Sequence, residues 1–249
     1  MLAFVLPLLI APFAGSFLGV LIVRLPEQRP VVLARSACAA CGTPLGPLDL
    51  VPLASFALQR GRCRYCGEPI GWFHPAVELA ALGVSVCAVL ACRTPQQVWA
   101  GCLLGWMLLA LGWIDALWLL LPDALTLPLL LAGLGVAIVT APDTVFWHAL
   151  GAASGYLGLR AVAATYRLLR GREGMGAGDA KLLAAAGAWL GIGALPWVVL
   201  LAALAGLAVA GVAAIAGRPV HATTALPFGA FLAVSFWLVW LYGSAWGLP

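Results

Sequence analysis

The chain of 249 residues is 64% hydrophobic and only 9% charged, and its mean hydropathy is +1.06. A soluble domain of this length would need far more charge to cover its surface, so the composition excludes a soluble protein and predicts an integral membrane protein. The formal net charge of +4 does not gather into a separate basic patch, which argues against a nucleic-acid partner.

The apolar residues form segments whose lengths approach the ~20 residues that a membrane-spanning helix needs. We therefore expect an all-α, polytopic membrane protein with about eight transmembrane helices. The segments lie near residues 2–23, 75–92, 97–114, 124–140, 146–166, 180–194, 196–216 and 226–246. The first has no basic residue before it and Arg24 after it, which indicates an uncleaved anchor with its N-terminus outside.

The positive charges predict the orientation of these helices, because cytoplasmic loops near span ends accumulate Lys and Arg. With the N-terminus outside, eight spans place twelve of the thirteen basic residues on or toward the cytoplasm and only Arg93 outside. We therefore expect the one sizeable polar region, about residues 24–74, to be a cytoplasmic loop.

Two C-x-x-C pairs stand in that loop, Cys38 with Cys41 and Cys63 with Cys66. Four thiolates can close a tetrahedral zinc site, with two ligands from each pair. The alternative is two disulfides, which the reducing cytoplasm disfavours. We expect a Zn²⁺ ion that stabilises a loop with little core of its own.

Three of the nine acidic residues stand at the cytoplasmic boundary of an expected span: Asp115, Asp123 and Asp179. Ionisable groups at such depth are costly and are functional candidates by default. For Asp123, a helix cap is an equally good interpretation, because it precedes an apolar segment with Thr126 three residues on.

Asp115 and Asp179 end up on the same side of the membrane in this topology. Two carboxylates brought together can share one proton, so that one activates a water and the other donates to the scissile carbonyl, as in aspartic proteases. Gly176 and Gly178 are expected to give the backbone beside Asp179 the freedom to adopt a positive φ and to approach a substrate strand. Lys181 either neutralises Asp179, positions substrate, or extends to the lipid headgroups.

Other polar residues have simpler interpretations. Asp49 is expected to be solvated, and Glu78 to lie near the surface just inside the second span, where a helix N-terminus favours an anion. The histidines His74, His148 and His221 show no metal-ligand spacing and are expected at the membrane interface.

Several motifs together resemble those of the type IV prepilin peptidases, which are G-x-G-D aspartic proteases of the bacterial inner membrane. The stretch GMGAGDAKLLAAAGAWLG (174–191) is similar to their G-x-G-D-x-K-L signature, and WIDALWLLLPDALTLPL (113–129) to their first aspartate motif. GSFLGVLIVRLP (15–26), RGRCRYC (60–66) and HPAVE (74–78) match the family's N-terminal half in order. The resemblance covers nearly the whole chain.

The resemblance implies that Asp115 and Asp179 are the catalytic pair, that Asp123 is an accessory carboxylate, and that the four loop cysteines bind zinc. It implies an endopeptidase that removes the basic leader of type IV prepilins or type II secretion pseudopilins on the cytoplasmic side. Such enzymes commonly then N-methylate the new N-terminus with S-adenosylmethionine. Gly61 and Glu78 occupy family positions associated with methyl transfer.

The resemblance also implies two parts of the chain: residues 1–92, which hold the methyltransferase region, and residues 93–249, which hold the peptidase helices. Three residues differ from the family's pattern: Gly19 and Leu50 stand where Asn is common, and Ala39 stands where Pro is usual. All three lie in the first part, so they concern methyl transfer rather than cleavage. An ion-coupled transporter and a non-enzymatic, zinc-bearing membrane anchor are the alternatives. The transporter predicts broken helices in paired repeats, which the sequence does not show, and the anchor leaves the aspartates without a purpose.

Overall fold

The computed structural model of the protein describes residues 2–32, 35–171, 176–217 and 226–243. Within these ranges it is helical, and the extended backbone forms only isolated bridges rather than strands. The chain divides into two compact units, Met1–Ala110 and Leu111–Pro249. Gly174, the first residue of the stretch 174–191 that contains the G-x-G-D signature, and His221 lie outside the described residues.

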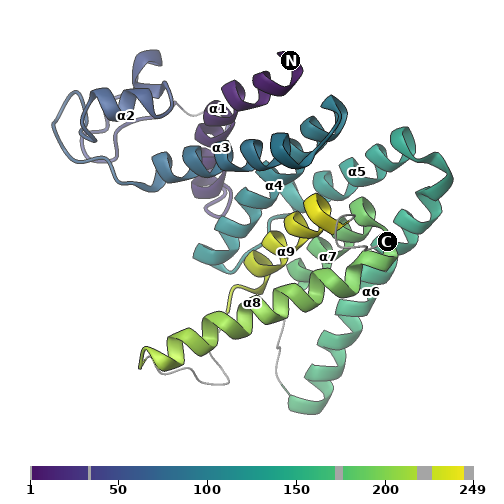
Figure 1. Ribbon diagram of the computed structural model, residues 1–249. Coiled ribbons are helices and arrows are strands. Elements are labelled where there is room, and N and C mark those ends of the chain that lie inside the picture. Colours follow the sequence, from purple (N-terminus) through teal and green to yellow (C-terminus); the bar gives the residue numbers. More distant parts are fainter. Residues whose placement is uncertain (1, 33–34, 172–175, 218–225, 244–249) are drawn as a thin grey trace. The chain divides into compact units, whose positions relative to one another are not determined.

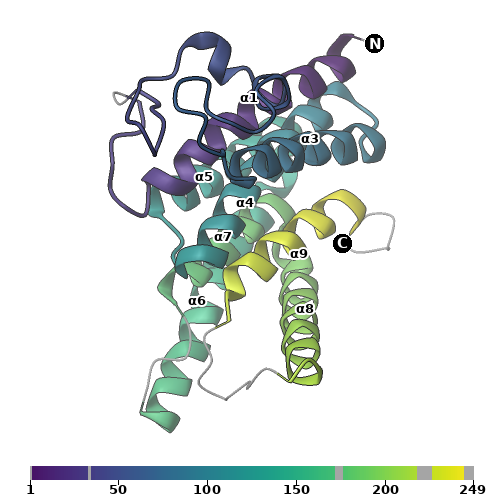
Figure 2. The ribbon, with the colours of Figure 1, turned by 90° about the vertical axis from the view of Figure 1, so that its left-hand side faces the viewer.

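The first unit is built on a pair of long helices, α1 (Leu2–Arg24) and α3 (Phe73–Ala91), which lie side by side (Figures 1 and 2). Their backbones approach closely at Gly15, where an added Cβ would lie 2.6 Å from the Cα of Glu78. Small residues permit such packing in lipid. The loop between them holds the 3₁₀ helix η1 (Pro47–Leu50) and the short helix α2 (Ala54–Leu58).

Helix α4 (Pro95–Trp118) runs from the first unit into the second. The rest of the second unit comprises α5, η2, α6, α7, η3, α8 and α9. Their bounds are Asp123–Thr140, Pro142–Thr144, Val145–Arg170, Ala177–Leu190, Ile192–Ala194, Leu195–Ile215 and Phe228–Tyr242. Helix α7 contacts α5, α6 and α9, and ten of its 14 residues are buried, so this short helix forms the core of the unit.

All eight apolar segments expected from the sequence are helices, which confirms the all-α, polytopic fold class. Among the described residues, five stretches are long and apolar enough to cross a membrane: α1, α3, α4, α5 and the continuous segment Ile192–Ile215. Helices α7 and α9 have 14 and 15 residues, which is short for a span. The count of eight spans stays a prediction.

The tightest helix contact in the second unit joins α6 and α7. A Cβ added at Gly187 would lie 2.2 Å from the carbonyl oxygen of Gly151, so the two backbones touch. The Nδ1 atom of His148 lies 3.0 Å from the carbonyl oxygen of Ala188 and links the same helices. Helix α7 is thus fixed against α6 by close backbone packing.

We expect Gly187→Ala to lower the free energy of unfolding by about 1–3 kcal/mol, because the added methyl group has no space. Gly158→Ala is the matched control, since it lies on α6 with no atom within 4 Å of the added Cβ. The midpoint of thermal unfolding in detergent checks this prediction. Equal midpoints for the two variants would contradict the close contact.

Candidate active site and metal site

The two aspartates expected to be catalytic are both buried in the second unit. Asp115 lies in the last turn of α4 and is 5% exposed, and Asp179 lies in the first turn of α7 and is 8% exposed. The negative charge of Asp115 acts on Asp179, so the two carboxylates interact. The fold therefore brings together two acidic groups that are far apart in the sequence.

Asp115 is held by the start of α9. Its Oδ2 accepts the backbone N–H of Ala230 at 2.8 Å, and the N–H of Gly229 also donates to the carboxylate. N–H groups in the first turn of a helix have no intrahelical partner, and the helix dipole there favours an anion. Sequence reasoning missed this anchor, although Pro227 and Gly229 before an apolar run are a helix-start signal.

Asp179 is held by its own helix terminus. Gly176 is the N-cap of α7, and Asp179 is the acidic residue in the first turn, where the helix dipole favours an anion. The expectation of a positive φ at Gly176 and Gly178 is wrong: Gly176 has φ −70°, and Gly178 lies inside the helix. The two glycines therefore lie at the start of a helix and not in a flexible turn.

The absence of side chains at two glycines does have a use, because Leu121 packs against both. An added Cβ would lie 2.8 Å from Leu121 Cβ at Gly178 and 2.8 Å from Leu121 Cδ1 at Gly229. The starts of α7 and α9 can therefore both approach Leu121. This arrangement sets the N-termini of two helices beside the two aspartates.

Lys181 forms an ion pair with Asp123, not with Asp179. The pair joins the first residue of α5 to α7, and its side chains are partly exposed. The interpretation of Asp123 as a helix cap is wrong, because Pro122 occupies the N-cap position and Asp123 makes no capping hydrogen bond. The accessory carboxylate is thus a partner of Lys181.

The four loop cysteines form one cluster in the first unit. Their Sγ atoms all lie within 4.8 Å of one another, and those of Cys38 and Cys66 are 3.9 Å apart. A tetrahedral zinc ion with bonds of about 2.3 Å to sulfur separates its ligands by about 3.8 Å. The cluster therefore fits a zinc ion, and the separations exclude a disulfide between these cysteines in this structure.

The two pairs have the same backbone turn, so the cluster is built from a repeated element. The N–H of Cys38 donates to the carbonyl of Thr43, and the N–H of Cys63 donates to that of Glu68. The glycine after each pair, at residues 42 and 67, has φ of +70° and +75°. A residue with a side chain is strained there, which explains the repeated C-x-x-C-G pattern that sequence reasoning missed.

Local hydrogen bonds favour the thiolate forms that bind metal. The hydroxyl of Thr43, together with its backbone N–H, lowers the pKa of the Cys41 thiol to about 6. The backbone N–H groups of Cys66 and Tyr65 lower the pKa of Cys63. The fourth ligand differs: although the backbone N–H of Glu68 opposes the change, burial and the side-chain hydrogen bonds with Cys63, Cys41 and Cys38 raise the pKa of the Cys66 thiol to about 12. The hydrogen bonds therefore favour the thiolate form at Cys41 and Cys63 before a metal binds.

The expectation that Asp49 is merely solvated is wrong. Its carboxylate accepts the backbone N–H of Gly46 at 3.0 Å, the amide of Gln59 at 3.0 Å and the hydroxyl of Tyr65 at 3.2 Å. The charge on Asp49 raises the pKa of Tyr65. Asp49 therefore ties η1 to α2 and to the second cysteine pair.

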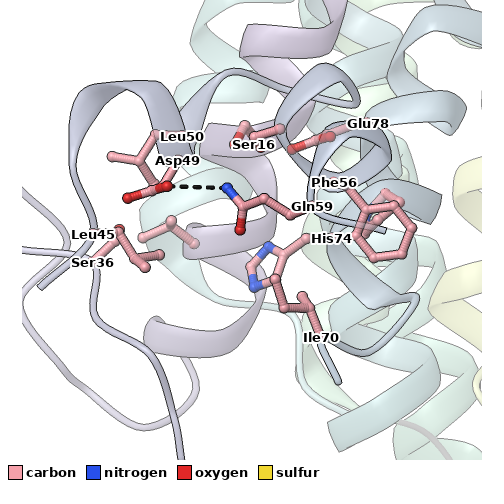
Figure 3. A pocket seen from close by; sticks show the side chains of 13 residues that line it. Ser16, Ser36, Leu45, Asp49, Leu50, Phe56, Gln59, Ile70, His74 and Glu78 are labelled. Carbon is pink, nitrogen blue, oxygen red and sulfur yellow. Dashed lines mark hydrogen bonds between the residues drawn. The ribbon is translucent and has the colours of Figure 1, made fainter. Parts of the chain in front are cut away.

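Beside Asp49 lies a cavity of about 140 Å³ in the first unit (Figure 3). Its polar lining comes from Ser16, Ser36, Asp49, Ser55, Gln59, His74 and Glu78. Glu78 is only 6% exposed and accepts the backbone N–H of Leu53 at 2.8 Å. The loop therefore folds back over the start of α3 and buries Glu78, which the sequence did not predict.

Gly61 does not line this cavity but shapes its wall. Gly61 has φ +68° in the turn after α2, and an added Cβ would lie 3.1 Å from the ring of Phe56, which does line the cavity. His74 lines the cavity and is not simply an interfacial residue. The sequence singled out Glu78 by resemblance but gave no sign of the part played by His74.

Buried, paired carboxylates in a polytopic helical unit define the class of membrane-embedded aspartic peptidases, and known proteins identify the family. Residues 9–94 match the family described as "Bacterial Peptidase A24 N-terminal domain", and residues 102–212 match the "Type IV leader peptidase family". The chain belongs to the type IV leader peptidase family. No solved structure matches it.

Similar proteins named "Prepilin leader peptidase/N-methyltransferase" occur in several bacteria. The one from Aeromonas hydrophila is 39% identical over 98% of this chain and 92% of its own length. The one from Pseudomonas aeruginosa is 38% identical over the same shares. The one from Burkholderia pseudomallei strain K96243 is 44% identical over 84% of this chain and 67% of its own length.

We expect the purified protein to contain zinc and Cys63→Ser to lose it, because a neutral hydroxyl is a poor zinc ligand. Cys87→Ser, a change outside the cluster, is the control and should keep the metal. Elemental analysis by mass spectrometry gives the metal content. A zinc-free wild-type protein that resists proteolysis of its loop as well as a zinc-loaded sample would contradict the assignment.

Proposed function

We propose that the chain is a membrane aspartic endopeptidase that removes the basic leader of type IV prepilins or type II secretion pseudopilins, and that it then N-methylates the new N-terminus. The observation that carries the peptidase is the pair of buried, interacting carboxylates at Asp115 and Asp179. The names of the relatives support both activities.

Peptide cleavage by the pair needs one ionised and one protonated carboxyl group. The ionised group takes a proton from a water, whose oxygen then adds to the scissile carbonyl carbon. The protonated group donates its proton to the carbonyl oxygen, and the C–N bond breaks as the amine takes up a proton. The backbone N–H groups of Gly229 and Ala230 keep the Asp115 carboxylate in place during these transfers.

Asp123 and Lys181 act as positioning residues in this proposal. Their ion pair joins the start of α5 to α7, on which Asp179 lies two residues before Lys181. Because the pair is partly exposed, it is worth at most about 1 kcal/mol of stability. Its contribution is to orient α7 rather than to stabilise the fold.

Methyl transfer belongs to the first unit in this proposal. When bound, S-adenosylmethionine supplies a methyl group from a positively charged sulfonium. The cavity is lined by Asp49 and Glu78, and its lining residues include no Lys or Arg. This charge pattern fits a positively charged ligand, and the wall formed at Gly61 and Phe56 closes one side.

The location follows from the topology. We propose an inner-membrane protein with its N-terminus outside and the cysteine-bearing loop in the cytoplasm, because that orientation puts twelve of thirteen basic residues on or toward the cytoplasm. The leader is then cut on the side where the loop lies. A transporter or a simple anchor explains neither the interacting aspartates nor the family membership.

We expect Asp115→Asn and Asp179→Asn each to reduce the rate of leader removal by about 10²–10⁴-fold, because a single carboxyl cannot be both acid and base. Asp143→Asn is the control, since Asp143 lies in the turn η2, away from the pair. Mass spectrometry of a purified prepilin after incubation in detergent measures the loss of the leader.

The same variants should still methylate a peptide that already begins at the mature N-terminus, since the proposed methyl-transfer cavity lies in the other unit. An Asp179→Asn variant that is folded and cleaves at the wild-type rate would rule out the proposed pair.

A further inference from the structure

The cavity of the first unit has an uneven charge lining. Its titratable groups are Asp49 from η1, His74 from α3 and Glu78 from α3, whereas α1 contributes only Ser16 and Val20. No Lys or Arg is among the residues that line it. The cavity therefore offers a site for a positively charged group small enough to enter about 140 Å³.

The two carboxylates are not equivalent. Asp49 already accepts three hydrogen bonds from the loop, as described above. Glu78 accepts the N–H of Leu53, and it has no ion-pair partner among the described residues. A buried carboxylate without a cation is costly, so a ligand that supplies the missing positive charge would be bound strongly.

The contact that holds Glu78 also constrains the loop. Leu53, whose N–H donates to Glu78, has φ +58°, which is unusual for a residue with a side chain. Strained backbone of this kind clusters at functional sites. The loop is thus held over the carboxylate in a defined position.

His74 lies one helical turn before Glu78, so both side chains project from the same face of α3 into the cavity (Figure 3). Gly19 of α1 leaves room for the ring, because an added Cβ there would lie 2.7 Å from Nδ1 of His74. An imidazole titrates at about 6.5 in water and can accept a proton near neutral pH. The cavity therefore pairs a counter-ion with a proton acceptor.

We propose that the cavity binds the N-terminal ammonium group of the cleaved peptide, with Glu78 as its counter-ion and His74 as the acceptor of the proton that the amine must lose. The ammonium gives one N–H proton to the imidazole. The freed lone pair on nitrogen then forms a bond to the methyl carbon while the bond of that carbon to the sulfonium sulfur breaks, and neutral S-adenosylhomocysteine leaves. The resulting methylammonium stays opposite Glu78, and the imidazolium releases its proton to water. This inference rests on the proposed N-methylation.

The sulfonium of the methyl donor is the other cation that this charge pattern could attract. The sulfonium loses no proton in the reaction, so it needs no proton acceptor such as the imidazole beside the carboxylate. The amine has both a charge to be neutralised and a proton to be removed. We therefore assign Glu78 and His74 to the amine.

Binding of the mature N-terminal peptide in the absence of methyl donor tests the counter-ion directly. Two peptides are compared, one with a free amine and one acetylated, which has no charge. Wild type should prefer the free amine by at least about 10-fold, as expected for a hydrogen bond between charged groups. Glu78→Gln should lose this preference while keeping its hydrogen bond from Leu53. Glu27→Gln, an exposed acid of the same unit, should keep the preference.

Equal binding of the two peptides by wild type would overturn the amine site. In that case, binding of the methyl donor identifies the cation. If Glu78→Gln weakens binding of S-adenosylmethionine but not of neutral S-adenosylhomocysteine, the cation at Glu78 is the sulfonium.

The role of His74 is tested by the rate of methyl transfer to the mature peptide as a function of pH. For wild type we expect the rate to rise as the His74 imidazole loses its proton with increasing pH, and then to level off. His74→Gln should be slower by about 10²-fold or more at pH 7, and its rate should rise instead through the amine pKa, near 7.7–8.0. A purely structural role would lower the rate without moving the profile, so an unmoved profile overturns the assignment of His74.

The control measurement is leader cleavage, which His74→Gln and Glu78→Gln should leave at the wild-type rate. Loss of cleavage in both variants would indicate misfolding, and His74→Asn then provides a smaller polar replacement for the pH profile. A wild-type protein that binds the free amine but never methylates it contradicts the proposed N-methylation and leaves the amine site standing.

Discussion

The structure depends on one constraint, which is that a polar group inside an apolar helical bundle must find its partner within the protein. Asp115 satisfies it with the backbone N–H of Ala230 at the start of α9, and Asp179 lies in the first turn of α7, where the helix dipole favours an anion. These contacts require close approach of backbone, which the glycines beside Leu121 allow. The same feature that makes the carboxylates tolerable in the membrane fixes their positions for chemistry.

The first unit meets the same constraint with a loop instead of a helix bundle. A loop of this size has little hydrophobic core, and its order comes from polar links: the cysteine cluster, the three hydrogen bonds to Asp49, and the contact of Leu53 with Glu78. The cavity lies where these links meet α1 and α3. Metal binding, loop order and the proposed methyl transfer are therefore physically connected.

The sequence predicted what depends on short-range pattern. Hydropathy located the eight apolar helical segments, because spans need long apolar runs, but not η1 and α2 in the polar loop. The C-x-x-C spacing predicted the cysteine cluster. The sequence did not predict which distant backbone groups hold the buried carboxylates. The burial of Glu78 depends on Leu53, 25 residues away, and the environment of Asp115 depends on Ala230, 115 residues away. The wrong expectation for Gly176 and Gly178 has a local cause, since their motif begins a helix rather than a turn.

The most direct test of the shared-proton mechanism is the pH dependence of leader cleavage, measured in single turnovers so that chemistry limits the rate. A pair that works with one ionised and one protonated carboxyl predicts a bell-shaped profile with two apparent pKa values that belong to the pair. A rate that stays flat across acidic and neutral pH, with chemistry still rate-limiting, would contradict the assignment of Asp115 and Asp179 as a catalytic pair.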